Sequence, residues 1–326
     1  MGNAECGVKV KGKAGFDFLF SFRIPHSEFR IPTMLDFRLI LVAVLWGVNF
    51  SAVKYALTDF FPLSFTLVRF FLASLFLFGV MGFRREAFGI ERRDRWPVIA
   101  LGFTGITLYN ILFMYGLERT TASNSALFIA TSPLFAAVLQ SLGKGERLTL
   151  RNALGFLLSF FGALLIIRAR TEAFTLSWQN LAGDVLTLCA AFSWALYTIL
   201  AGPLLQRYSP VKVTAYAMGL GTVLLLPFGM GELARQSWSN VSILTWAALA
   251  FAAFAAGGVA YVLWYQGVKR IGAARTIVYH YLMPVAAVIF AALALHERIT
   301  VLHLLGGAAV LSGVYLVQRN RKEQRA

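Results

Sequence analysis

The chain has 326 residues, of which 58% are hydrophobic and only 14% are charged, against about 25% charged in a typical soluble domain. So few charges cannot cover a water-facing surface, and the apolar residues fall in long runs, which excludes an ordinary soluble protein. The net charge of +15 would suit nucleic acid, but the basic residues lie in short gaps between apolar runs, so we predict a lipid bilayer and no nucleic acid as partner.

Residues 1–37 form a polar N-terminal extension without the apolar core and cleavage site of a signal peptide. Met34 stands directly before the first apolar run, and Met34-Leu-Asp-Phe-Arg38 would make an ordinary short cytoplasmic start. We therefore hypothesise that Met34 is the natural initiator and that the residues before it are dispensable. A truncated chain that fails to insert or loses activity would contradict this.

Ten apolar segments follow, each close to the roughly 20 residues that a helix needs to cross a bilayer core about 30 Å thick. We predict an all-α integral membrane protein. The ten predicted transmembrane helices are Leu39–Thr58, Leu63–Phe83, Trp96–Leu117, Ala122–Leu142, Leu150–Ile167, Gly183–Leu204, Val211–Met230, Ile243–Val268, Ala274–Leu295 and Val301–Val317.

The distribution of Lys and Arg predicts how these helices are oriented. With the N-terminus inside, 23 of the 30 basic residues fall on inside segments, six on outside ends and loops, and Arg69 lies within a span. Cytoplasmic loops carry such an excess of basic residues. We therefore predict that both termini are cytoplasmic, including the basic C-terminal tail 319–326.

The second half of the chain repeats the first at nearly constant spacing. Trp46 and Pro62 recur 148 residues later, as Trp194 and Pro210. Nine further residues recur after 151: Gly116, Arg119, Ala122, Pro133, Glu146, Arg147, Thr149, Gly155 and Gly162. Because each repeat holds five helices, an odd number, the second enters the membrane from the opposite face. Such inverted repeats are common in secondary transporters.

The motifs resemble the drug/metabolite transporter superfamily, and in particular its ten-helix EamA-type members. The matching residues are Trp46-Gly-Val-Asn49-Phe50, Arg69-Phe70, Thr131-Ser-Pro133, Gly145-Glu146-Arg-Leu-Thr149 with Gly155 and Gly162, Trp194-Ala-Leu-Tyr197, Pro284-Val285 and Glu297-Arg-Ile-Thr300. The resemblance implies two five-helix EamA repeats, which we place at residues 38–168 and 182–318. It also implies a multi-pass protein of the bacterial plasma membrane that exports or takes up amino acids or related metabolites.

Two prolines near the centres of their spans, Pro133 and Pro284, are partners in the repeat. Proline cannot donate to the carbonyl four residues earlier, so we predict helix breaks that free the carbonyls of Ile129 and His280. His280 is also the one histidine deep in a span. It is a candidate for coupling solute movement to protons, or else a neutral histidine that is hydrogen-bonded to a neighbouring helix.

Aromatic and amide side chains mark a candidate cavity. Trp46 with Asn49, and Trp194 with Tyr197, have i,i+3 spacing and share one face of the first and sixth helices. Asn110 and Tyr265, with Tyr261 and Gln266, add polar groups from the third and eighth helices. Aromatic walls with few polar groups suit a small amphipathic ligand, although packing is the commoner role of such residues.

Cations within the spans are Lys54 and Arg69, both in the predicted outer half. Arg69 is too deep to reach the interface easily, so we expect it to make a buried polar contact or to bind a carboxylate or phosphate. All 15 acidic residues lie in tails, loops or span ends. A midplane carboxylate for an organic cation is therefore missing, which argues against cationic drug efflux.

The sequence thus predicts a secondary transporter of a small metabolite with a carboxylate, such as an amino acid, and export is the expected direction. It predicts no catalytic residue, metal or cofactor, because a P-loop, HExxH and GxSxG are all absent from the sequence. Two alternatives stay open. A sugar-phosphate or nucleotide-sugar exchanger would use Lys54 and Arg69 for phosphate, and an intramembrane enzyme would form a product without transport.

Overall fold

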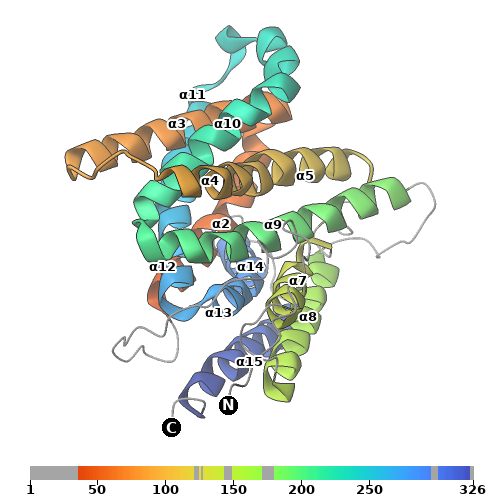
Figure 1. Cartoon of the computed structure of the whole chain (residues 1–326). Helices are drawn as coiled ribbons and strands as arrows, with labels where there is room; N and C mark the ends of the chain where they lie inside the picture. The colour runs from red at the N-terminus through yellow and green to blue at the C-terminus, as the bar shows by residue number, and fades with distance from the viewer. Residues whose placement is uncertain are drawn as a thin grey trace, which may run out of the picture.

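A computed structural model describes residues 36–120, 125, 128–142, 149–170, 180–294 and 300–323. Every regular element among these residues is a helix, so the predicted all-α class is confirmed for this part of the chain. Helices far apart in the sequence lie side by side, most clearly α8 and α15 at one end of the molecule (Figure 1). The hypothesis about Met34 and the predicted tail from residue 324 onward lie outside the described residues.

The helices follow the predicted spans closely, and three of the spans are built from several consecutive pieces. In chain order the main elements are α2 Phe37–Ala56, α3 Pro62–Phe83, α4 Arg95–Gly102, η2 Phe103–Leu108, α5 Tyr109–Glu118, α7 Ser132–Leu142, α8 Leu150–Arg170, α9 Leu181–Arg207, α10 Pro210–Arg235, α11 Ile243–Ala250, η4 Phe251–Val259, α12 Ala260–Ile271, α13 Ala273–Ile277, η5 Val278–Tyr281, α14 Leu282–Ala294 and α15 Val301–Glu323.

Eight continuous helical stretches of the described chain are long and apolar enough to cross a bilayer. A ninth, within α2, is apolar over the shorter stretch Phe37–Val53. Of the predicted span Ala122–Leu142, the structure describes α7 and a few residues before it. The chain is therefore a multi-pass membrane protein, as the composition predicts.

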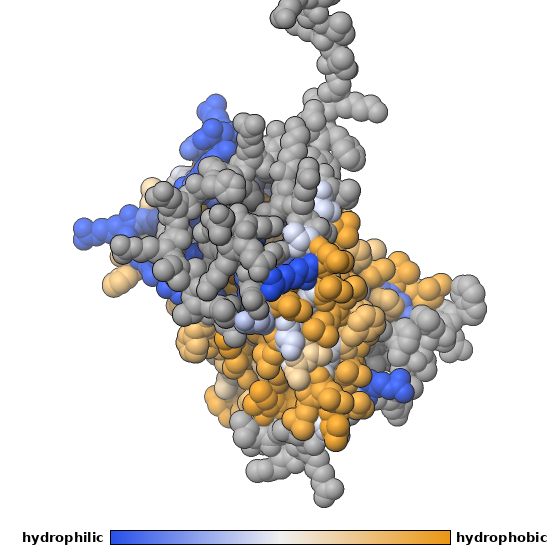
Figure 2. All heavy atoms as spheres, turned by 90° about the horizontal axis from the view of Figure 1, so that it is seen from below, coloured by the Kyte–Doolittle hydropathy of each residue, from blue (hydrophilic) through white to orange (hydrophobic). Residues whose placement is uncertain are grey.

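Apolar side chains cover much of the outer surface, as a lipid-facing protein requires. Leu154 and Phe161 of α8 and Leu304 of α15 are each more than half exposed. Figure 2 shows such hydrophobic residues gathered over a broad area of one face. In water this area would be unfavourable, and against acyl chains it costs nothing.

Close packing of α8 against α15 depends on four glycines. A Cβ added at Gly162 would lie 2.7 Å from the carbonyl oxygen of Gly306, and one at Gly155 would lie 2.8 Å from that of Gly313. Between these two contacts, the Ser159 hydroxyl donates to the carbonyl of Val310 at 3.3 Å. Small residues let membrane helices approach this closely, because dispersion and polar contacts replace the missing hydrophobic effect.

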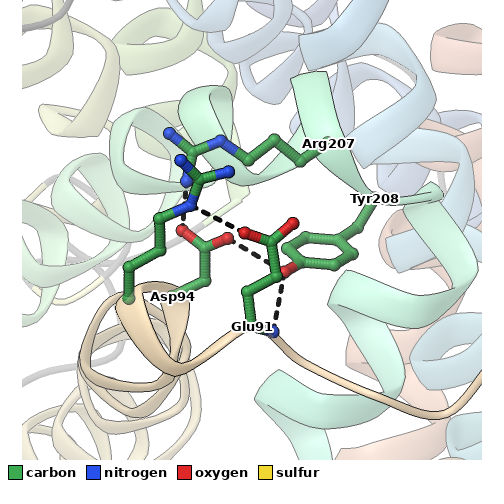
Figure 3. Close-up of polar contacts among 5 residues, drawn as sticks. Glu91, Asp94, Arg207 and Tyr208 are labelled. Atoms are coloured by element: carbon green, nitrogen blue, oxygen red, sulfur yellow. Dashed lines mark hydrogen bonds and ion pairs between the residues drawn. The ribbon is translucent and has the colours of Figure 1, made fainter.

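Polar contacts tie the α3–α4 segment to the junction of α9 and α10. The Asp94 carboxylate, which is buried, accepts hydrogen bonds from the Arg207 guanidinium and, at 2.9 Å, from the Tyr208 hydroxyl (Figure 3). Burial raises the pKa of Tyr208 above its ordinary value, so this hydroxyl stays a donor at neutral pH. Lys212 completes the tie with bonds to the carbonyls of Ala87 and Gly89, each 2.6 Å.

The loop between α2 and α3 is held in a similar way by the end of α10 and the start of α11. The Asp59 carboxylate accepts from the Thr245 hydroxyl at 2.6 Å and from the Ser242 N–H at 3.0 Å. Hydrogen bonds from Thr245 and Ser242 lower the pKa of Asp59, so it remains ionised at neutral pH. Glu232 accepts from the N–H of Leu63 at 2.7 Å and so caps the start of α3.

Two neighbouring glycines of α15 test whether the close contact with α8 stabilises the fold. We expect Gly306→Ala to destabilise the purified protein by roughly 1–3 kcal/mol, because the new methyl group would sit 2.6 Å from the carbonyl oxygen of Gly162. Gly307→Ala meets nothing within 4 Å and is the matched control. Thermal unfolding in detergent measures both, and equal melting temperatures for the two variants would contradict this account.

Candidate functional site

Aromatic side chains from four segments meet at the centre of the described structure. We call Trp46, Trp194, Tyr197, Tyr261, Trp264, Tyr265 and His280 the central aromatic cluster; all of them are buried. The rings of Trp46 and Trp194 lie edge to face at 5.5 Å. His280 stacks on Trp194 at 5.7 Å and 15°, and meets Trp46 edge to face at 6.1 Å. Such geometries are favourable for aromatic rings.

Periodicity explains why α12 supplies three members of the cluster. Tyr261, Trp264 and Tyr265 have i, i+3 and i+4 spacing and so share one face of the helix. Tyr265 lies 5.2 Å from Tyr197 of α9, ring to ring. The Tyr197 ring in turn covers Gly105, where an added Cβ would come within 2.0 Å of the ring. Close approach of α9 to the third predicted span therefore requires glycine at this position.

Two π-helical segments, η2 and η4, lie beside the cluster. The indole N–H of Trp46 donates to the carbonyl of Ala256 in η4 at 2.9 Å, and the Ser193 hydroxyl donates to the carbonyl of Thr104 in η2 at 2.7 Å. Wider helical turns of this kind are rare and often mark functional sites. Here each π-helical segment offers a carbonyl to a side chain of a neighbouring helix.

Several polar atoms at the centre are buried without a hydrogen-bond partner among the described residues. They are the indole nitrogens of Trp194 and Trp264 and the amide oxygen of Asn49. A buried donor or acceptor with no partner costs about 1–3 kcal/mol. Such atoms are available to bind the polar groups of a ligand.

Arg69 of α3 lies next to the cluster. Its Nη2 donates to the Asn110 amide oxygen at 3.3 Å, and the guanidinium covers the Phe70 ring at 4.4 Å. The Phe70 ring in turn lies 6.2 Å from the ring of Tyr261, a member of the cluster. Its Nε is buried without a partner, and no described carboxylate forms an ion pair with Arg69. This site therefore has positive charge that the described side chains do not neutralise.

Both predicted helix-breaking prolines stand in the first turn of a helix that follows an irregular stretch. Pro133 is the second residue of α7, after a turn at residues 130–131, and the Ser132 hydroxyl donates to the carbonyl of Ile129 at 2.5 Å. Pro284 is the third residue of α14, after the 3₁₀ segment η5. His280 belongs to η5, so the irregular turn places its ring against Trp194.

The structure brings together most of the residues that the sequence analysis singled out. Trp46, Trp194, Tyr197, Tyr265 and His280 share the cluster, while Asn110 holds Arg69 beside it. Gln266 instead accepts from Arg38 at the start of α2. The side chain of Lys54 lies outside the described atoms.

Sequence reasoning missed Trp264, Tyr109 and both π-helical segments. The i,i+3 spacing of Tyr261 and Trp264 would have identified Trp264, because residues at this spacing lie on one helical face. Tyr109, whose ring lies 5.3 Å from Trp194, directly precedes Asn110 in the chain. No group of three or more His, Cys, Asp or Glu side chains that could hold a metal occurs among the described residues.

Comparison with known proteins gives the family. The EamA-like transporter family matches residues 34–168 and 181–319. A protein of Archaeoglobus fulgidus named "Uncharacterized transporter" is 34% identical over 85% of this chain and 95% of its own. A solved crystal structure superposes with a TM-score of 0.75 at 18% identity, over 89% of this chain and 97% of that one, which supports the fold.

Two further relatives have more specific names. A "Probable terminal-alkyne amino-acid exporter" of Streptantibioticus cattleyicolor is 31% identical over 88% of this chain and 94% of its own. A "Probable amino-acid metabolite efflux pump" of Escherichia coli is 28% identical over 85% and 92%, respectively. The central aromatic cluster, the lipid-facing surface and these matches agree: this chain is a plasma-membrane transporter that belongs to the EamA-like transporter family.

Proposed function

We propose that the chain exports a small carboxylate-bearing metabolite, an amino acid or a close relative, by alternating access. The observation that carries the proposal is Arg69, a cation beside the central aromatic cluster to which no described carboxylate is paired. A substrate carboxylate would supply the missing negative charge, and its apolar part would contact the aromatic rings. The printed names of the Streptantibioticus cattleyicolor and Escherichia coli relatives support this substrate class.

The architecture that we propose has ten transmembrane helices in two inverted repeats, residues 38–168 and 182–318. Contacts between α8 and α15 support it. Gly155 and Gly162 correspond to Gly306 and Gly313 in the repeat, yet Gly155 packs on Gly313 and Gly162 on Gly306. Ser159 likewise bonds to Val310, its own equivalent 151 residues later. A two-fold axis between the helices produces such reciprocal contacts.

Contacts at the centre of the molecule support the same proposed relation. Trp46 and Trp194, which are equivalent at the 148-residue spacing, contact each other directly. Residues Phe103–Leu108 of η2 correspond to residues 254–259, which all lie in η4. In secondary transporters, two such halves exchange conformations and expose a central site to each side in turn.

The orientation that we propose places both chain ends inside the cell. The α3–α4 segment and the α9–α10 junction are then cytoplasmic, and their arginines and lysines follow the positive-inside rule. The α2–α3 loop and the end of α10, which carry Asp59 and Glu232, then face outside. We refer to these as the inner and outer faces.

One rival function involves the same cation. A sugar-phosphate or nucleotide-sugar exchanger would place phosphate at Arg69 and Lys54, since guanidinium binds phosphate as readily as carboxylate. Inhibition of transport by phosphate esters and not by carboxylates would favour that exchanger. An intramembrane enzyme is less well supported, because the relatives are named as transporters.

The first prediction concerns the central aromatic cluster. Cells that express the intact chain are expected to differ in the metabolites of cells and medium from cells that express Trp46→Ala/Asn49→Ala at an equal level. Loss of the Trp46 ring and of the Asn49 amide removes ligand contacts, so the redistribution of one solute class should disappear. Untargeted metabolite profiling measures this. If both proteins cause the same redistribution, the central aromatic cluster is not the binding site. If neither protein causes any redistribution, the result counts against transport of a metabolite.

The second prediction concerns proton coupling, which we assign to His280. Export driven by a pH gradient should become independent of that gradient in His280→Gln, because glutamine keeps polar atoms but does not titrate. Uptake or efflux by proteoliposomes at matched and opposed pH on the two sides measures it. His303→Gln, a half-buried histidine outside the central aromatic cluster, is the control. Unchanged gradient dependence in His280→Gln would exclude this role.

A further inference from the structure

Two buried carboxylates lie at the beginnings of α2 and α9, the first helices of the two proposed repeats. Asp36 directly precedes α2, and Asp184 lies in the first turn of α9. Both are more than nine-tenths buried. They are separated by 148 residues, the same spacing that relates Trp46 to Trp194. The two carboxylates therefore hold equivalent positions, and the proposed topology places them at opposite faces of the membrane.

At the inner face, Asp36 ties the start of α2 to the junction of α12 with α13. Its Oδ2 accepts from the Arg270 guanidinium at 3.1 Å, and its backbone N–H donates to the Tyr279 hydroxyl at 2.9 Å. Arg270 lies in the last turn of α12, and Tyr279 lies in η5 next to His280. This contact therefore reaches the irregular turn that carries a member of the central aromatic cluster.

At the outer face, Asp184 ties the start of α9 to the segment that follows α5. Its Oδ1 accepts from the Thr120 hydroxyl at 2.5 Å. Gly183 packs directly on the same segment, since an added Cβ would lie 2.5 Å from the carbonyl carbon of Arg119. Arg119 is the equivalent of Arg270 in the repeat. Equivalent carboxylates thus hold equivalent junctions, with different hydrogen-bond donors.

Each contact joins the first helix of one repeat to the junction between the third and fourth helices of the other. We propose that Asp36 and Asp184 are the two latches of the transport cycle: release of Asp36 opens the central site to the inside, and release of Asp184 opens it to the outside. The inference rests on the proposed inverted topology. In this structure both latches are closed, and the central aromatic cluster is buried.

The strength of the contacts suits repeated opening. Arg270 is about one-third exposed at the latch, so water screens its ion pair with Asp36. The Asp36–Arg270 pair is therefore not the fully buried kind of ion pair that is costly to separate. At the outer latch, the Thr120 hydroxyl that donates to Asp184 is a neutral group.

A single cysteine in the centre can report which face is open. Asn49→Cys is made in a chain that also carries Cys6→Ser and Cys189→Ser, and a membrane-impermeant maleimide is added to right-side-out or inside-out vesicles. We expect Asp36→Asn to raise labelling from the inner side roughly tenfold relative to the outer side, the shift that about 1.4 kcal/mol produces. Thr120→Val, which removes the Thr120 hydroxyl that donates to Asp184, should shift labelling toward the outer side instead.

Control variants with the same change in charge distinguish the loss of a latch contact from a general loss of negative charge. Glu91→Gln at the inner face and Glu118→Gln at the outer face remove exposed carboxylates that pair with neighbouring arginines. Neither should change the labelling ratio. We expect Arg270→Asp alone to abolish closure of the inner side. The double variant Asp36→Arg/Arg270→Asp should restore it, because the ion pair is re-formed with its charges exchanged, whereas a second substitution would not rescue a misfolded variant.

The outcomes distinguish this inference from the proposed function. If the parent is labelled with a clear preference for one side, and Asp36→Asn and Thr120→Val leave that preference unchanged or shift it in the same direction, the latches are refuted and the transporter proposal stands. If Asn49→Cys reacts equally from both sides in every variant, the central aromatic cluster does not lie on an alternating path. In that case the proposed mechanism itself fails.

Discussion

Hydrocarbon offers no hydrogen-bond partner to a peptide group, so each N–H and C=O of a membrane span must find its partner within the protein. A continuous helix such as α3, whose one proline stands at its first position, meets this need internally. Where the helix departs from regular geometry, a side chain takes over: Ser193 bonds to a carbonyl of η2, Trp46 to one of η4, and Ser132 to the carbonyl that Pro133 leaves free. Side chains of the protein thereby stabilise these irregular turns.

This constraint also places the candidate site. Because η4 and η5 are irregular, they bring α12 and His280 against Trp46 and Trp194, and the rings fill the space between the four segments. A buried cation is costly unless other groups balance its charge, so the surroundings of Arg69 indicate what the site can bind. Asn110 and the Phe70 ring satisfy it in part, and a ligand with negative charge would satisfy the rest. Packing, backbone geometry and charge thus converge on one region.

Much of this could be predicted from the sequence, for physical reasons. Long apolar runs admit only helices in a bilayer, and the backbone donor missing from Pro133 and Pro284 predicts the irregular stretches before them. Pro203 and Pro227 nevertheless stand inside continuous helices, so proline alone does not determine where a break occurs. Trp46 and Trp194 emerge as a pair from the spacing of the repeat. The sequence also requires a polar partner for Arg69, because charge deep in a span is costly.

Other features depend on tertiary packing and have no local signal. The residues of η2 and η4 are equally compatible with α-helix, and no local pattern marks the wider turns, which Tyr197 and Trp46 contact from neighbouring helices. Asn110 as the partner of Arg69, and Arg207 as the partner of Asp94, follow from how distant helices meet. The same holds for the contacts of Asp184, whose position in the sequence indicates only that a carboxylate stabilises the start of a helix.

The central claim is that Arg69 and the central aromatic cluster bind a carboxylate-bearing solute. Tryptophan fluorescence of the purified full chain tests it most directly, with the common amino acids and their methyl esters as probes. Because Trp46, Trp194 and Trp264 line the cluster, at least one amino acid should produce a saturable change that its methyl ester does not. This change should be lost in Arg69→Gln and kept in the exposed control Arg235→Gln. Equal binding of acid and ester, or full binding by Arg69→Gln, would contradict the claim.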